Sequence, residues 1–128
     1  MTAGLGFGSG AFVSAIRLFS SADIAKAGTL TSGKVIIKNY AINGNFSLAL
    51  KLVGAGQVDV KYQLSPDDNA TYVTPSAGTN IATNFTVASG TSGFDIIGFT
   101  PEVAPFLKVS ITEDNVGTAV IDGWLLMA

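Results

Sequence analysis

The most regular hydrophobic pattern in the chain is an alternation across residues 46–53 that recurs across residues 57–64. Successive side chains of a strand point to opposite faces of a sheet, so this period of two predicts two half-buried β-strands. The side chains expected to point inward are Phe46, Leu48, Leu50 and Leu52 in the first run, and Val58, Val60, Tyr62 and Leu64 in the second. Gly54-Ala55-Gly56 joins the runs, and a short glycine-containing loop between two strands predicts a hairpin.

A second pair of strands is predicted in the C-terminal part of the chain. Leu107, Val109 and Ile111 alternate with polar residues, and a turn over residues 113–117 leads into a strand from Thr118 to about Met127. The short turn between the two runs predicts a second hairpin.

Four further segments have strand character, and the prolines lie between the strand runs. The segments are residues 12–19, 34–40, 81–87 and 94–99. The prolines are Pro66, Pro75, Pro101 and Pro105, which stand where a missing amide donor interrupts no sheet. Residues 20–28 are either one or two helical turns, capped by Ser21 and stopped by Gly28, or a loop between strands.

Seven or eight short strands with turns at regular spacing predict an all-β protein, an antiparallel β-sandwich of jelly-roll-like design. The length fits one domain, which we assign to residues 11–128. Residues 1–10 carry glycine at positions 4, 6, 8 and 10, and they are expected to form a flexible N-terminal arm. Such an arm, with Phe7 in it, is suited to ordering against a neighbouring subunit.

The last predicted strand differs from the others because it is apolar on both faces. A sandwich strand needs only one apolar face, so Val120, Trp124 and Leu126 are candidate subunit-interface residues, together with Phe7 of the arm. The alternative is that loops of the same chain cover this face.

The composition removes most catalytic chemistry, because the 128 residues include no histidine and no cysteine. Imidazole bases and thiolate nucleophiles are therefore excluded. The net charge of -2, with Arg17 as the sole arginine, argues against nucleic-acid binding. No run of 18 apolar residues and no secretory signal are present, so we expect synthesis in the cytoplasm of whichever cell makes the chain and no membrane association.

Carboxylates are the remaining candidates for chemistry. Asp67-Asp68-Asn69 and Glu113-Asp114-Asn115 offer oxygen ligands for calcium, but neither has EF-hand spacing and both are typical of turns. Asp122 lies in an apolar strand, either as an acid with a raised pKa or as a residue facing solvent or a partner. We expect no catalytic residue, no metal site and no cofactor, and therefore no enzyme.

Several segments, in this order, resemble a type of small β-sandwich domain found in virion proteins of tailed phages. The matching segments are Gly44-Asn45-Phe46-Ser47-Leu48, Gly54-Ala55-Gly56-Gln57-Val58, Tyr62-Gln63-Leu64-Ser65-Pro66-Asp67-Asp68, Tyr72-Val73-Thr74-Pro75-Ser76, Ser89-Gly90, Phe99-Thr100-Pro101, and residues 104–109 and 118–125. The resemblance covers roughly residues 44–127. The chain departs from it at Phe106-Leu107-Lys108, where related sequences often place an aromatic residue and an arginine.

The resemblance implies a capsid decoration, connector, tail or fibre component that binds itself and other virion proteins, usually as a homo-oligomer. A capsid decoration (cement) protein or a tail-associated component is the role it most favours. A second hypothesis is a carbohydrate-binding β-sandwich for host or glycan attachment, which would use exposed aromatics such as Tyr40, Tyr72 and Trp124.

Overall fold

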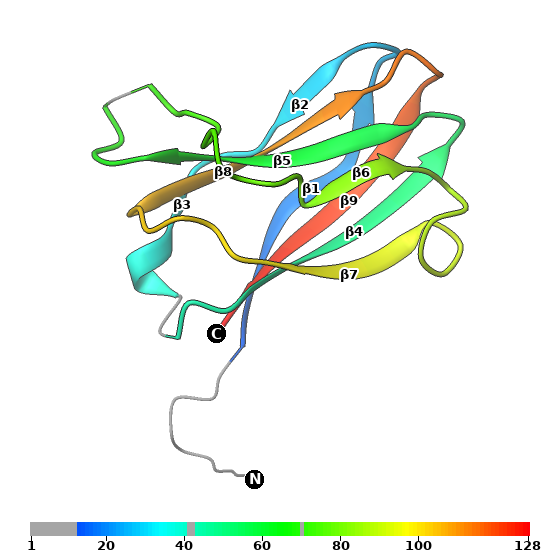
Figure 1. Ribbon diagram of the computed structural model, residues 1–128. Coiled ribbons are helices and arrows are strands. Elements are labelled where there is room, and N and C mark those ends of the chain that lie inside the picture. The colour runs from blue at the N-terminus through cyan, green and yellow to red at the C-terminus, as the bar shows by residue number, and fades with distance from the viewer. Residues whose placement is uncertain (1–12, 41–42, 70) are drawn as a thin grey trace, which may run out of the picture.

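The structure is a computed structural model, and it describes residues 13–40, 43–69 and 71–128. The described residues form nine strands and one 3-10 helix (Figure 1). The strands are β1 Ser14–Ile24, β2 Thr29–Thr31, β3 Val35–Ile36, β4 Phe46–Gly54, β5 Val58–Ser65, β6 Ala82–Phe85, β7 Phe94–Phe99, β8 Phe106–Glu113 and β9 Ala119–Met127, and the helix is η1 Ile37–Asn39. The expected arm at residues 1–10 lies outside the described residues.

The strands form two antiparallel sheets that pack face to face (Figure 1). Sheet A has the order β1-β9-β4-β7, and sheet B has the order β2-β8-β5-β6 with β3 also paired to β8. The chain folds back on itself: β1 pairs with β9, β2 with β8, β4 with β7 and β5 with β6. This nested pairing is a jelly roll, so the predicted all-β sandwich is confirmed. Among the described residues the strands number nine rather than seven or eight.

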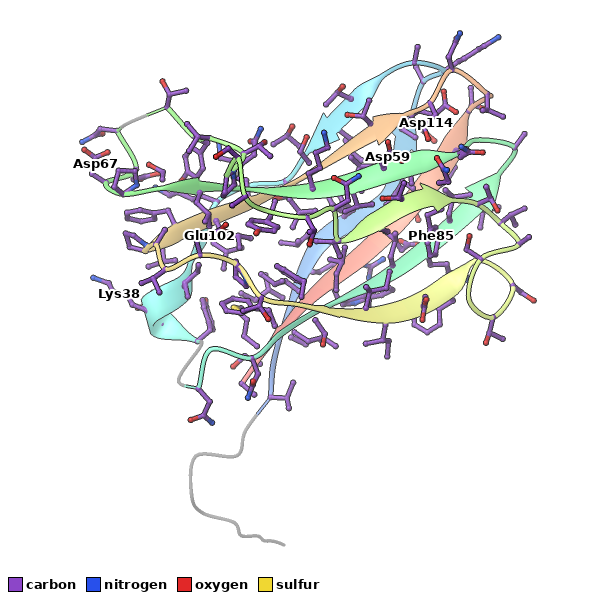
Figure 2. The ribbon with its side chains drawn as sticks, in the orientation of Figure 1. Lys38, Asp59, Asp67, Phe85, Glu102 and Asp114 are labelled. Atoms are coloured by element: carbon purple, nitrogen blue, oxygen red, sulfur yellow. The ribbon has the colours of Figure 1, made fainter. Side chains whose placement is uncertain are left out.

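The core lies between the two sheets and is built from the positions that the alternation marked as inward. These are Phe46, Leu48, Leu50 and Leu52 of β4, Val58, Val60, Tyr62 and Leu64 of β5, and Leu107, Val109 and Ile111 of β8. Phe85 of β6 is also buried, and Figure 2 shows it pointing into the space between the sheets. Each large apolar side chain moved out of water here contributes about 1.5–3 kcal/mol.

Both predicted hairpins are wrong. β4 belongs to sheet A and β5 to sheet B, while β8 belongs to sheet B and β9 to sheet A. Each short turn therefore carries the chain across the sandwich instead of pairing its two flanking strands. Gly54 has φ +113°, and a Cβ there would lie 2.8 Å from the Thr118 carbonyl oxygen, so the crossing at this point requires glycine. A short glycine-containing loop fits a hairpin or a crossing equally well.

Two local predictions also change. Residues 20–24 continue β1 instead of starting a helix, and a turn follows that is closed by the Gly28 N–H donating to the Ala25 carbonyl at 2.8 Å. The strand expected over residues 34–40 is limited to β3, because the backbone turns into η1 at Ile37.

Glu113, at the end of β8, is a buried carboxylate that connects three crossings between the sheets. Its side chain is 2% exposed. Oε1 accepts the Ala27 N–H at 2.7 Å from the β1–β2 connection, and Oε2 accepts the Gln57 N–H at 3.1 Å from the β4–β5 connection. In its own turn the carboxylate accepts the N–H groups of Asn115, Val116 and Gly117. Loss of this acceptor would leave partly buried amides of three segments without their protein partner.

The same contacts determine the ionisation of Glu113. Burial raises the pKa of this carboxyl, but the N–H donors of Ala27, Gln57, Gly117 and Val116 outweigh burial because they stabilise the charged form. The net result lowers the pKa of Glu113 from 4.5 to about 2.

We predict that Leu50→Asp abolishes soluble folded protein. Leu50 is 0% exposed, and an unpaired carboxylate in the core costs several kcal/mol, a large part of the stability of a small domain. Circular dichroism melting checks this, with Lys61→Asp on an exposed position of β5 as the matched control. Cooperative melting of the Leu50→Asp protein would contradict the face assignment.

We predict that Glu113→Gln lowers the melting temperature by roughly 5 °C or more and weakens its dependence on acid, since the amide replaces one acceptor oxygen with a donor. A carboxyl whose pKa is lowered by folding stabilises the fold fully above its unfolded pKa of 4.5, and this contribution is lost as the pH falls through about 2. Between pH 4.5 and about 2, the melting temperature of the unmodified protein should therefore fall more steeply with decreasing pH than that of Glu113→Gln. Asp23→Asn, at an exposed position near the end of β1, is the control, and an equal slope in all three proteins would contradict the assignment.

Candidate functional site

The outer face of sheet A is the most apolar surface among the described strands. Residues paired across neighbouring strands share a face, so the register identifies the outward side chains. On the two central strands the pairs are Val120 with Val53, Asp122 with Lys51, Trp124 with Ala49, and Leu126 with Ser47. β7 places Phe94 beside Lys51 and Ile96 beside Ala49, and β1 places Arg17 beside Trp124.

Large hydrophobic side chains remain accessible on this face. The exposed fractions are 52% for Val53, 41% for Phe94 and 58% for Ile96. Val120, Trp124 and Leu126 are half-buried. A contiguous group of such side chains on several strands is typical of a surface that contacts another molecule.

The outer face of sheet B has a different composition, because its outward positions are polar except for Phe106 and Ile36 at one end. The register assigns to it Thr29, Thr31, Asp59, Lys61, Gln63, Lys108, Ser110 and Thr112. The two faces of one sandwich therefore differ in the free energy needed to remove them from water. Sheet A, with its apolar outer face, is the better candidate for a protein contact.

Trp124 is held in a defined orientation by its neighbours. The Arg17 guanidinium lies 4.3 Å from the centre of the indole ring, which is within cation–π distance. Phe94 meets the same indole edge to face, with ring centres 6.4 Å apart. Lys51, Thr91, Ser92, Phe94 and Trp124 line a shallow hollow of about 430 Å³. The surface thus carries an ordered aromatic pair beside polar groups.

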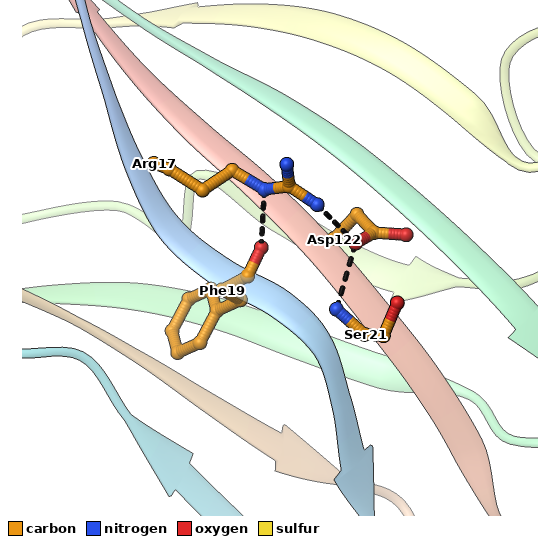
Figure 3. A network of polar contacts seen from close by, with 4 residues as sticks. All are labelled: Arg17, Phe19, Ser21 and Asp122. Carbon is orange, nitrogen blue, oxygen red and sulfur yellow. Dashed lines mark hydrogen bonds and ion pairs between the residues drawn. The ribbon is translucent and has the colours of Figure 1, made fainter.

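Asp122 organises an irregular part of β1 (Figure 3). Its Oδ1 accepts the Ser21 N–H at 2.8 Å and the Arg17 guanidinium at 2.5 Å, while Arg17 Nε donates to the Phe19 carbonyl at 2.8 Å. The register of β1 on β9 shifts between Arg17 and Phe19 and again between Phe19 and Ala22, as expected for β-bulges. The Asp122 network therefore pins the bulged strand to β9.

This environment contradicts the hypothesis that Asp122 is an acid with a raised pKa. The Ser21 N–H, as the largest cause, and Arg17 hold the pKa of Asp122 below its ordinary value, although burial opposes them. At neutral pH Asp122 is a charged, partly exposed residue within the face.

The structure brings together three of the four predicted interface residues. Val120, Trp124 and Leu126 lie in a row along β9 on the outer face of sheet A, and Phe7 lies outside the described residues. Their role in an interface stays a prediction. Sequence reasoning missed Val53, Phe94 and Ile96. Residues 94–99 are apolar in both phases of the alternation, so the pattern alone did not show which side chains point outward.

The other candidate sites are engaged within the chain. The Glu113 oxygens accept backbone amides, and Asp68 accepts Lys34 Nζ and the Tyr72 hydroxyl. Burial and the Asp68 hydrogen bond raise the pKa of Tyr72 to about 12, and Lys108 lies 4.3 Å from the Tyr72 ring centre. In the part of the chain that the structure describes, no three histidine, cysteine or acidic residues are grouped to hold a metal ion. The described helical segment is also too short to cross a membrane.

The aromatics proposed for glycan binding do not share one surface. Trp124 is on the outer face of sheet A, Tyr72 packs with Lys108 of sheet B, and Tyr40 follows η1. Of these three residues, Trp124 alone packs against a second aromatic ring in the described part of the chain, that of Phe94.

Comparison with known proteins gives a match of fold. No family model matches the sequence, and no curated protein matches it. Among solved structures, the chain is similar to the VP2 subviral particle protein of infectious bursal disease virus, with a TM-score of 0.52 and 14% identity. The match covers 90% of this chain and 32% of the VP2 chain, so the present chain spans about a third of that protein. At this identity the similarity supports the β-sandwich fold.

We predict that Trp124→Ala changes the size of any oligomer more than it changes the melting temperature. Trp124 lies on the outer face, so truncation removes contact area without opening a cavity in the core. Size exclusion with light scattering, beside thermal melting, checks this. Tyr40→Ala, which removes a 37% exposed aromatic that lies away from the outer face of sheet A, is the control. An unchanged species for Trp124→Ala would remove this residue from the interface.

Proposed function

We propose that the chain is a structural virion protein that acts by protein–protein contact, as a capsid decoration protein or tail-associated component of a tailed phage. The observation that carries the proposal is the apolar outer face of sheet A on a jelly-roll sandwich whose other outer face is largely polar. A rigid two-layer scaffold with one apolar face is suited to forming repeated contacts in an assembly.

Two further observations support this role. The fold is similar to that of VP2 in the subviral particle of infectious bursal disease virus. The full sequence lacks histidine and cysteine, which removes the commonest general base and the thiolate nucleophile and favours contact over catalysis. We infer that the partners are other copies of the chain and other virion proteins.

Glycan attachment is a second candidate function, and the hollow beside Trp124 favours it. Thr91, Ser92 and Lys51 offer hydrogen-bonding groups next to the Trp124 and Phe94 rings. An apolar surface with a few polar groups is the usual composition of a small-ligand site. Binding on a glycan array that Trp124→Ala abolishes would support this candidate.

We predict that the chain is present at a fixed copy number in purified particles of the phage that encodes it. Quantitative mass spectrometry of the particles measures this number, and electron microscopy then locates regularly spaced density into which the sandwich fits. A protein made during infection but absent from washed particles would contradict the virion role.

A further inference from the structure

The two central strands of sheet A carry complementary side chains along their outer face. Two of the cross-strand pairs join unlike partners: Trp124 lies beside Ala49, and Asp122 lies beside Lys51. The pair Val120 and Val53 is apolar on both strands. Going from β9 to β4, a large side chain is matched with a small one and a negative charge with a positive one.

This arrangement has a consequence for two-fold symmetry. An axis that runs parallel to the strands, between β9 and β4, places β9 of one copy against β4 of the other at the same level. Trp124 then faces Ala49 of the second copy, Asp122 faces its Lys51, and Val120 faces its Val53. A two-fold contact must be self-complementary, and these rows meet that condition. An axis across the strands would instead place Lys51 against Lys51.

We propose that a second copy of this chain docks face to face on the outer surface of sheet A about this axis. The inference deepens the proposed assembly function by naming the partner and the geometry. Two aligned sheets pack about 10 Å apart at about −30°, so the rows near the axis remain opposed despite the twist. The apolar side chains leave water, and the unlike charges of Asp122 and Lys51 meet across the contact.

The size and chemistry of the face favour this occupant. The four strands have 11, nine, nine and six residues. At about 3.3 Å per residue and about 4.8 Å between strands they cover roughly 550 Å², about two thirds of the ~800 Å² per partner of a standard interface. Val53, Phe94 and Ile96 would lose their exposed apolar surface. The charges on this face, Arg17, Asp23, Lys51 and Asp122, sum to zero, so two copies do not repel each other through it.

A single-cysteine variant tests the geometry, because the chain has no cysteine of its own. In the proposed dimer the two residue-53 Cα atoms lie one strand spacing and one sheet spacing apart, or about 11 Å, and their side chains point toward each other, so the Val53→Cys thiols are within reach of a short bismaleimide linker. We expect Val53→Cys to give mainly covalent dimer. Lys61→Cys, on the outer face of sheet B, is the matched control and should give background cross-linking. Equal cross-linking of the two variants would overturn the geometry.

A charge reversal tests the contact itself. Lys51→Glu places a carboxylate opposite Asp122 twice per dimer, and we expect the dimer Kd to rise about ten-fold or more. Lys51 is exposed, so melting should change little; Lys61→Glu is the control for both measurements. Sedimentation velocity over a concentration series measures the Kd of the dimer.

The outcomes separate this inference from the proposed function. A chain that stays monomeric through the micromolar range, or dimers that Lys51→Glu leaves intact, would overturn the inference. If such a chain is nevertheless found in phage particles, the virion role stands and another virion protein covers sheet A. If Val53→Cys cross-links as expected but the chain is absent from particles, the dimer stands and the virion role fails.

Discussion

The buried carboxylate of Glu113 is the constraint on which the arrangement of the two sheets depends. A jelly roll must carry its chain between layers several times, and each crossing leaves backbone amides without a sheet partner. Glu113 accepts such amides from the β1–β2, β4–β5 and β8–β9 connections at one end of the sandwich. One ionised carboxylate accepts N–H groups that would otherwise need several separate acceptors. The same N–H groups stabilise its negative charge.

The crossings determine which surfaces face outward. Because β4 and β9 lie side by side in the middle of sheet A, their outward residues form continuous rows flanked by β1 and β7. Those rows are apolar or paired in charge, whereas the corresponding rows of sheet B hold threonine, serine, lysine and acid side chains. The asymmetry gives the molecule one face suited to contact and one suited to water. This is the physical basis for the proposal that the protein acts by contact in an assembly.

Within sheet A, the Arg17–Asp122–Ser21 network connects fold and surface. It holds the bulges of β1 against β9, and the same guanidinium packs on Trp124. Gly123 contributes from the inner side, since a Cβ there would lie 3.0 Å from the Phe19 ring. The orientation of Trp124 is therefore determined by backbone irregularity in the neighbouring strand β1. The residue pattern of 118–127 gives no sign of this irregularity.

The amino-acid sequence was sufficient to predict the all-β class and the side chains of β4, β5 and β8 that point into the core, because alternation is a local property of an extended chain. It also singled out Val120, Trp124 and Leu126, since a strand apolar on both faces is visible without a partner. Strand partners were decided by the tertiary structure alone. Short turns such as Gly54-Ala55-Gly56 suit a hairpin or a crossing, and the choice depends on pairing between distant halves of the chain. The structural role of Glu113 and the addition of Phe94 and Ile96 to the face follow from that pairing, so only the folded chain reveals them.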